Sequence, residues 1–113
     1  MDKTLFERII AREIPADIVY ETDDVLAFKD INPQAPVHIL VIPRIEIPRL
    51  MDMKEADKGL VGHLMYVAQK VAVDQGLESG FRIVINNGPD ACQSVYHLHA
   101  HVMGGRGFSW PPG

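Results

Sequence analysis

Apolar residues recur at helical spacing in two parts of the chain. In the first, a capping-box pattern that begins at Thr4 precedes an apolar run at 5–10, which predicts a short helix that ends before Pro15. In the second, another capping-box pattern begins at Asp52, and a longer helix is expected to stop at Gly76. One face of that longer helix carries Leu60, Leu64, Val67 and Val71.

The other apolar segments are interpreted as strands. Residues 18–30 predict a hairpin that turns at 22–24, and two prolines make 31–36 a loop. Three more strands are expected, at 38–42, 81–86 and 96–103. The segment between the last two strands and the tail are rich in Gly and Pro, which is typical of irregular structure. This order predicts an α+β domain, an antiparallel five-stranded sheet with one short and one long helix on one side.

The composition narrows the classes of function. At 113 residues the chain is expected to form one domain. Its net charge of −4 and its lack of a Lys/Arg run argue against a nucleic-acid polymer as partner, although a single nucleotide needs only a local anion site. The single cysteine permits no intrachain disulfide, and the first residues include acids and no continuous apolar run. We therefore expect no signal peptide, no membrane anchor and, by default, a cytoplasmic protein, with nuclear or organellar locations left open.

Three of the five histidines lie in one short stretch, at 97, 99 and 101. Alternate side chains of a strand point to opposite faces, so these three are expected in a row, with Leu98 and Ala100 on the core face. One interpretation of the row is a solvated outer face, but such faces normally mix several polar residue types. Two other interpretations give the row a chemical role.

A metal site is the first of these. Two histidines that are two residues apart can share a zinc ion with a third ligand from elsewhere. His97 and His101 would lie about 13 Å apart at the strand rise of roughly 3.3 Å per residue, so all three rings cannot converge on one ion. The chain also has no cysteine pair and no His-Glu-x-x-His sequence. Catalytic zinc is therefore the weaker of the two chemical interpretations.

A phosphate site is the second. Histidines that donate N–H groups could hold phosphate oxygens at the ends of the row, while the central ring, neutral at its attacking nitrogen, could meet the phosphorus. The loop 86–94 offers backbone N–H groups to an anion, and Ser94 could protonate a leaving group. A loop-capping hydroxyl is the simpler interpretation of Ser94, as turn residues are of Asn86 and Asn87.

The segment 92–113, "CQSVYHLHAHVMGGRGFSWPPG", resembles the Hint branch of the histidine triad family, whose signature is His-x-His-x-His followed by apolar residues. Residues 4–21 and 30–43 resemble the same branch, so the likeness covers nearly the whole chain. The resemblance implies a homodimer in which two sheets join into one of ten strands. It also implies hydrolysis of purine nucleoside phosphoramidates and aminoacyl nucleotides, with no metal or other cofactor.

Carried over by position, the resemblance also implies the catalytic roles. His99 would be the nucleophile and would form a nucleotidyl-histidine intermediate. His38 and the backbone carbonyl of His97 would orient its ring. His101 would hold phosphate oxygens, and Ser94 would lie near the leaving group.

The resemblance further implies how a purine nucleotide is held. The backbone at Gln93 and Ser94 would contact phosphate oxygens, and Asn86 would lie near the leaving group. Asp30 would bind the ribose hydroxyls, and Trp110 would reach the site of the partner chain. The base would occupy an apolar slot formed by Leu5, Phe6, Ile9, Phe28 and Ile31.

Two positions depart from the branch, and three rival functions stay open. Glu46 stands where the branch often has a basic or aromatic residue, and Cys92 replaces a more usual glycine.

The first rival function is that of a dinucleoside polyphosphate hydrolase of the same superfamily. Those sequences usually have Pro-Arg after the triad and lack a serine at the position of Ser94, whereas this chain has Gly-Gly-Arg at 104–106. The second rival is a non-catalytic nucleotide-binding adaptor, and the third is a zinc protein.

Overall fold

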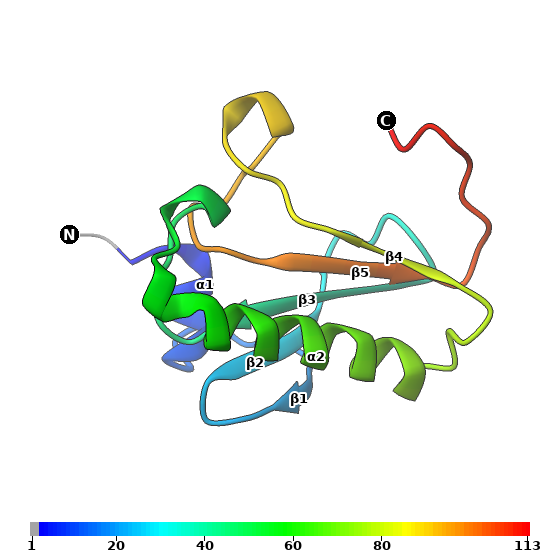
Figure 1. Ribbon diagram of the computed structural model, residues 1–113. Coiled ribbons are helices and arrows are strands. Elements are labelled where there is room, and N and C mark those ends of the chain that lie inside the picture. Colours follow the sequence, from blue (N-terminus) through cyan, green and yellow to red (C-terminus); the bar gives the residue numbers. More distant parts are fainter. Residues whose placement is uncertain (1–2) are drawn as a thin grey trace.

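One antiparallel sheet of five strands organises the fold in the computed structural model, which describes residues 3–113. The strand order is β1-β2-β3-β5-β4, so β1 and β4 are its edges (Figure 1). The strands are β1 (Ile18–Glu21), β2 (Val25–Lys29), β3 (Val37–Pro43), β4 (Phe81–Val84) and β5 (Ala100–Gly104). The helices are α1 (Leu5–Ile10) and α2 (Lys58–Asp74). The predicted α+β class is confirmed.

The two helices cover opposite faces of the sheet, so the expectation that both lie on one side is wrong. Alternate residues of β2 and β3, such as Val25 and Ile39, are buried under α2. The residues between them, such as Leu26 and Leu40, are buried with Phe6 of α1. A signal for this was present in the sequence, because β2 and β3 are continuous apolar runs, which are typical of strands buried on both faces.

Helix α1 begins where predicted and is short. The Thr4 hydroxyl accepts the backbone N–H of Glu7 at 3.1 Å, and the Glu7 carboxylate accepts the N–H of Thr4 at 2.8 Å, so the capping box is present. The helix ends at Ile10 because Arg12 adopts a left-handed conformation with φ of 62°. This early end leaves residues 13–17 as an irregular segment beside the sheet.

Helix α2 begins later than predicted. The Asp52 carboxylate accepts the backbone N–H of Arg49 at 3.0 Å and closes a short 3-10 turn, so it does not cap the long helix, which begins at Lys58. The predicted end at Gly76 is confirmed, with a left-handed φ of 81° just after the helix. Within residues 3–113, no helix is both long enough and apolar enough to cross a membrane.

The strand predicted at 96–103, which was expected to hold all three histidines, is shorter at its start. Strand β5 begins at Ala100, so residues 96–99 lie outside the ladder. In that segment the Leu98 N–H donates to the Ile47 carbonyl oxygen at 2.6 Å, which ties it to the loop after β3 rather than to a strand. Leu98 and Ala100 are buried as expected, with 1% and 0% of their surfaces exposed. Only the third histidine of the stretch therefore has the strand geometry that was expected for all three.

One part of the sheet face that carries α1 remains open. The core residues under α1 come from β2 and β3, with no contribution from β4 or β5. His101 and Met103 of β5 point to this face, because Ala100 and Val102 between them are buried under α2. The register places Arg82 of β4 opposite Met103. The candidate site therefore lies at the border between the part covered by α1 and the open part.

Candidate active site

A cavity of about 200 Å³ lies beside α1 and brings together most of the predicted site residues. Its apolar lining includes all five residues predicted for the base slot, and its polar lining includes Asp30, Ser94, His99 and His101. The slot residues are Leu5, Phe6, Ile9, Phe28 and Ile31. The lining does not include His38, His97, Asn86, Gln93 or Trp110.

Several lining residues were missed by the sequence analysis. They are Ile14, Pro15, Ala16, Lys29, Leu40 and Val95. Leu40 could have been found from alternation, because it lies two residues after His38 on the same strand and therefore on the same face. The segment 14–16 had no such signal, because its position depends on where the chain turns after α1.

His99 is held in one tautomer by a backbone oxygen. Its Nδ1 lies 2.8 Å from the carbonyl oxygen of His97, and a carbonyl can only accept, so Nδ1 carries the proton. In the neutral ring Nε2 is therefore the bare nitrogen. The ring is 4% exposed and packs edge-on against Phe6, with centroids 4.9 Å apart. Burial lowers the pKa of His99 below its usual value of 6.5, so the ring is neutral at pH 7.

His38 and His101 form a second hydrogen-bonded unit. The backbone N–H of Gln34 donates to Nδ1 of His38 at 3.0 Å, so the proton of a neutral His38 lies on Nε2. That Nε2–H lies 2.9 Å from Nδ1 of His101 and 3.4 Å from a carboxylate oxygen of Asp30. His101 must then carry its own proton on Nε2, where it can donate to a phosphate oxygen. His38, which was expected to orient the His99 ring, is thus hydrogen-bonded to His101.

Burial keeps both of these rings neutral. It lowers the pKa of His38, against an opposing effect of Asp30. It lowers the pKa of His101 to about 4, with further contributions from the neighbouring His99 and His38. At pH 7 His101 therefore offers a neutral N–H donor rather than a cation.

His97 does not belong to a row of three rings. Its Nε2 donates to the carbonyl oxygen of Pro43 at 2.7 Å, and its side chain is 0% exposed. Within residues 3–113 its Nδ1 is a buried atom without a hydrogen-bond partner. The expectation of three side chains on one face is wrong because residues 96–99 are not in the strand. Only His99 and His101 line the cavity, with ring centroids 4.9 Å apart.

The loop before the histidines is held by the Gln93 side chain. Its Oε1 accepts the Gly88 N–H at 2.8 Å, and its Nε2 donates to the Pro48 carbonyl oxygen at 2.7 Å. The Gln93 backbone N–H donates to the Gly88 carbonyl oxygen at 3.1 Å, so it is already occupied. The backbone of Gln93 and Ser94 was predicted to contact phosphate oxygens. Of these two residues, only Ser94 lies in the cavity lining, and within residues 3–113 its N–H donates to no backbone carbonyl.

Asn86, Trp110 and the two departures from the branch lie away from the cavity lining. Trp110 is 82% exposed on the tail. Cys92 is exposed and adopts a left-handed conformation with φ of 66°, which explains why a glycine suits this position. Glu46 lies near enough to His97 to oppose the lowering of its pKa by burial.

Asp30, His38 and His101 form a cluster whose ligand atoms lie within 4.8 Å of one another. Two histidines and a carboxylate are a common zinc ligand set, so the cluster must be tested against that metal. Zinc at Nε2 of His38 would move the ring proton to Nδ1, where it would meet the N–H of Gln34, donor against donor. The hydrogen bonding of His38 therefore does not fit a zinc ligand.

Comparison with known proteins identifies the family. The HIT domain matches residues 11–108. The chain belongs to the histidine triad family. It is 53% identical over 112 residues to Adenylylsulfatase HINT1 of Arabidopsis thaliana, covering 97% of this chain and 76% of that protein. It is 54% identical over 112 residues to the 14 kDa zinc-binding protein of Zea mays, covering 97% of this chain and 88% of that protein.

Solved structures agree with this membership. The HIT family hydrolase from Legionella pneumophila superposes with a TM-score of 0.95 at 44% identity, over 98% of this chain and 100% of that one. The histidine triad nucleotide-binding protein from Candida albicans superposes with a TM-score of 0.83 at 29% identity, over 96% of this chain and 83% of that one. Together with the Arabidopsis relative, they place the chain in the Hint branch of the histidine triad family.

The buried histidines predict how stability depends on pH. The pKa values of His38, His97, His99 and His101 are all lowered from 6.5 in the folded protein. Below pH 6.5 these histidines bind protons in the unfolded chain but stay neutral in the folded chain. The free energy of unfolding therefore falls as pH falls from 6.5 toward the folded pKa values. Urea unfolding at a series of pH values between about 7 and 5 measures this slope.

His101→Gln provides the control, because one titrating ring is removed and the slope should become shallower. A free energy of unfolding that stays constant over this range in the wild-type protein would contradict the assigned neutral rings.

Proposed function

We propose that this protein is a metal-independent hydrolase that cleaves the P–N bond of purine nucleoside 5′-phosphoramidates, and related aminoacyl nucleotides, through a nucleotidyl intermediate on His99. The observation that carries the proposal is the hydrogen bond from His99 Nδ1 to the His97 carbonyl oxygen, which leaves Nε2 bare in a ring that lines the cavity. The solved relatives described as a hydrolase and as a nucleotide-binding protein support the general class.

In the first step, the Nε2 lone pair of His99 forms a bond to the α-phosphorus as the P–N bond breaks. The ring then carries a positive charge with its proton still on Nδ1. The His97 carbonyl oxygen, 2.8 Å away, stabilises that charge. The Nε2–H of His101 donates to a phosphate oxygen and stabilises the charge that develops there.

The leaving nitrogen needs a proton, because an amide anion is a poor leaving group. Ser94 lines the same cavity as His99, and its hydroxyl can supply that proton, which it regains from water. A water molecule then attacks the phosphorus of the intermediate and gives its proton to solvent. Nucleoside monophosphate leaves, and His99 returns to its neutral tautomer.

The cavity has a polar and an apolar part that suit the two ends of a nucleoside. Phe6 and Phe28 lie edge to face, with centroids 5.7 Å apart, and form an apolar wall for a flat base. The Asp30 carboxylate is in the lining, where it can accept hydrogen bonds from ribose hydroxyls. The ribose would therefore lie between the wall and the histidines.

Adenylyl sulfate is a second candidate substrate, favoured by the description of the Arabidopsis relative as an adenylylsulfatase. The attack by His99 would be the same, but sulfate leaves without a proton. The two substrates therefore differ in their need for Ser94. Hydrolysis of dinucleoside polyphosphates and nucleotide binding without turnover are the remaining alternatives.

We expect His99→Ala to lower the kcat for adenosine 5′-phosphoramidate by at least about a thousandfold, because the nucleophile is lost. His63→Ala is the matched control, since His63 lies outside the cavity and contacts Thr22, and it should retain activity within about twofold. Quenching of the wild type during turnover with an alkaline denaturant should trap protein that carries one nucleotidyl group, since the P–N bond of a nucleotidyl-histidine survives base and is hydrolysed by acid. Full activity of His99→Ala would overturn the mechanism, and loss of wild-type activity in EDTA would support a zinc enzyme instead.

We expect Ser94→Ala to lower kcat/KM for the phosphoramidate by about 10–100-fold, because a proton donor to the amine is removed. Turnover of adenylyl sulfate by the same variant should change by less than about threefold, since its leaving group needs no proton. Equal losses on both substrates would mean that Ser94 holds the phosphate instead. Turnover of diadenosine polyphosphates alone would favour the other hydrolase branch.

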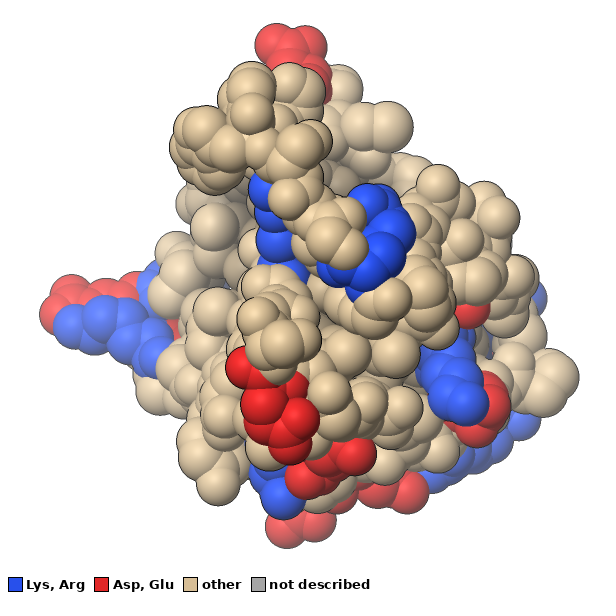
Figure 2. Space-filling model, turned by 90° about the vertical axis from the view of Figure 1, so that its right-hand side faces the viewer, with Lys and Arg blue, Asp and Glu red and all other residues tan. Residues whose placement is uncertain are grey.

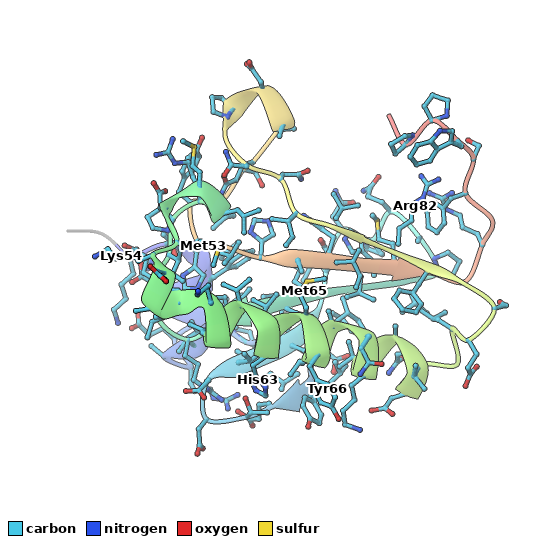
Figure 3. All side chains as sticks on the ribbon, viewed as in Figure 1. Met53, Lys54, His63, Met65, Tyr66 and Arg82 are labelled. Carbon is cyan, nitrogen blue, oxygen red and sulfur yellow. The ribbon has the colours of Figure 1, made fainter. Side chains whose placement is uncertain are left out.

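We also propose that the protein is a homodimer in which two β4 edges pair. Strand β4 is an edge whose residues are only partly buried, and unpaired apolar edges favour association. Met65 of α2 is 38% exposed and points toward the β4 side, whereas His63 and Tyr66 point toward the β1 side (Figure 3). A partner paired at β4 would cover Met65 and bring its own tail, with the exposed Trp110, to the open part of the sheet.

Met65→Glu and Tyr66→Glu test this arrangement as a matched pair, because both residues are exposed on α2 but on opposite sides. Light scattering should give twice the chain mass of 12.6 kDa for the wild type and for Tyr66→Glu. Met65→Glu should shift toward the monomer, because it would bury a charge in the interface. A monomeric wild type would overturn the proposal.

A further inference from the structure

The loop of residues 31–36 lies between the C-terminal tail and the histidines, and the tail contacts it directly. Gly105 has a φ of 88°, and a Cβ built on it would lie 2.9 Å from Cβ of Pro36, so only glycine permits this approach. The next residue, Arg106, donates from Nη2 to the Gln34 carbonyl oxygen at 3.3 Å. Gly105 and Arg106, the first two residues after β5, thus support this loop.

The tail that provides Arg106 is itself held by the side chain of Arg82 on the edge strand β4. The guanidinium carbons of Arg106 and Arg82 lie 4.2 Å and 5.0 Å from the ring centroid of Phe108. Arg82, on β4, also donates to the Ser109 carbonyl oxygen and reaches up to the tail (Figure 3). On this side of the molecule basic side chains lie in the upper middle of the surface, and most acidic side chains lie in its lower half (Figure 2). These contacts of Phe108 and Ser109 therefore fix the part of the tail that carries Arg106.

Gln34 connects this tail contact to the active site through its other backbone group. Its carbonyl accepts from Arg106, and its N–H donates to Nδ1 of His38 at 3.0 Å. His38 in turn lies 2.9 Å from Nδ1 of His101. We call the succession Arg106, Gln34, His38 and His101 the relay.

The direction of the relay depends on the Gln34 N–H. With this donor in place, His38 is protonated on Nε2 and donates to His101, so His101 presents an N–H to the cavity. Without it, His38 can carry its proton on Nδ1 and accept from His101 at Nε2. His101 would then present a bare nitrogen, which repels a phosphate oxygen. The Gln34 N–H, together with the Asp30 carboxylate 3.4 Å from Nε2 of His38, thus decides whether the His101 ring presents a donor to phosphate.

We infer that the backbone N–H of Gln34, in a loop supported by Arg106, positions the phosphate-binding histidine by deciding which nitrogen of His101 carries the proton. Gln34 and Arg106 are positioning residues, since neither lines the cavity. The consequence for catalysis rests on the proposed function, but the tautomers themselves are measurable without any substrate.

The first experiment uses the unmodified protein. Long-range ¹H–¹⁵N spectra of the imidazole rings distinguish a protonated from a bare nitrogen. We expect Nε2 to be protonated and Nδ1 to be bare in both His38 and His101 at pH 7. His38 protonated on Nδ1 in the wild type would overturn the inference without recourse to any variant.

The second experiment removes only the Gln34 N–H, by total synthesis of a chain with an ester in place of the peptide bond before Gln34. We expect the proton of His101 to shift toward Nδ1, and both the affinity for AMP and kcat/KM to fall by about 10–100-fold. Gln34→Ala is the matched control, because it keeps the N–H and removes only the side-chain bond to Asn32. Its tautomers should match those of the wild type.

Arg106→Ala and Arg82→Ala separate the relay from general support of the tail. Arg106→Ala should produce part of the tautomer shift, and Arg106→Lys should restore part of it. Arg82→Ala also loosens Phe108 but touches no relay member, so its tautomers should stay unchanged. If the folded ester chain kept the tautomers of the wild type, the inference would be overturned. If the tautomers of the ester chain shifted but the wild type did not turn over the phosphoramidate, only the proposed function would be overturned.

Discussion

Burial of imidazole rings without a full counter-charge is the constraint on which this site depends. A buried histidine stays neutral, and a neutral ring has one donor and one acceptor whose places must be decided by neighbours. Here backbone groups decide them: the His97 carbonyl for His99, the Pro43 carbonyl for His97 and the Gln34 N–H for His38. The nitrogens that are proposed to attack phosphorus and to bind phosphate are therefore set by where the main chain runs.

The departure of residues 96–99 from the sheet is part of this arrangement. In a regular ladder the carbonyl of His97 would be shared with a neighbouring strand, and it would not be available to a side chain two residues later. Because the ladder starts only at Ala100, that carbonyl is free to accept from His99. One buried nitrogen, Nδ1 of His97, remains without a partner within residues 3–113, a cost of about 1–3 kcal/mol that the stable core around it must offset.

The division of the sheet explains why the site is where it is. Helix α1 buries one part of a face and supplies the apolar wall of the cavity through Phe6. The other part, around His101 and Arg82, is left open and borders an unpaired edge strand. In the proposed function, a nucleoside would be enclosed on the α1 side, while the reacting phosphate would face the open side, which water and the proposed partner chain would approach.

The sequence by itself determined the class of fold, the apolar slot and the identity of the candidate reactive histidines, because these depend on local periodicity and on a family motif that spans nearly the whole chain. It did not determine that the helices lie on opposite faces, although the continuous apolar runs of β2 and β3 indicated burial on both sides. Only the tertiary structure decided the tautomers and the pairing of His38 with His101, because these depend on contacts between residues 63 apart in the chain. The role of Gln34 has no sequence signal, since a backbone N–H is the same in every residue except proline and acquires its function only from the atom that it faces.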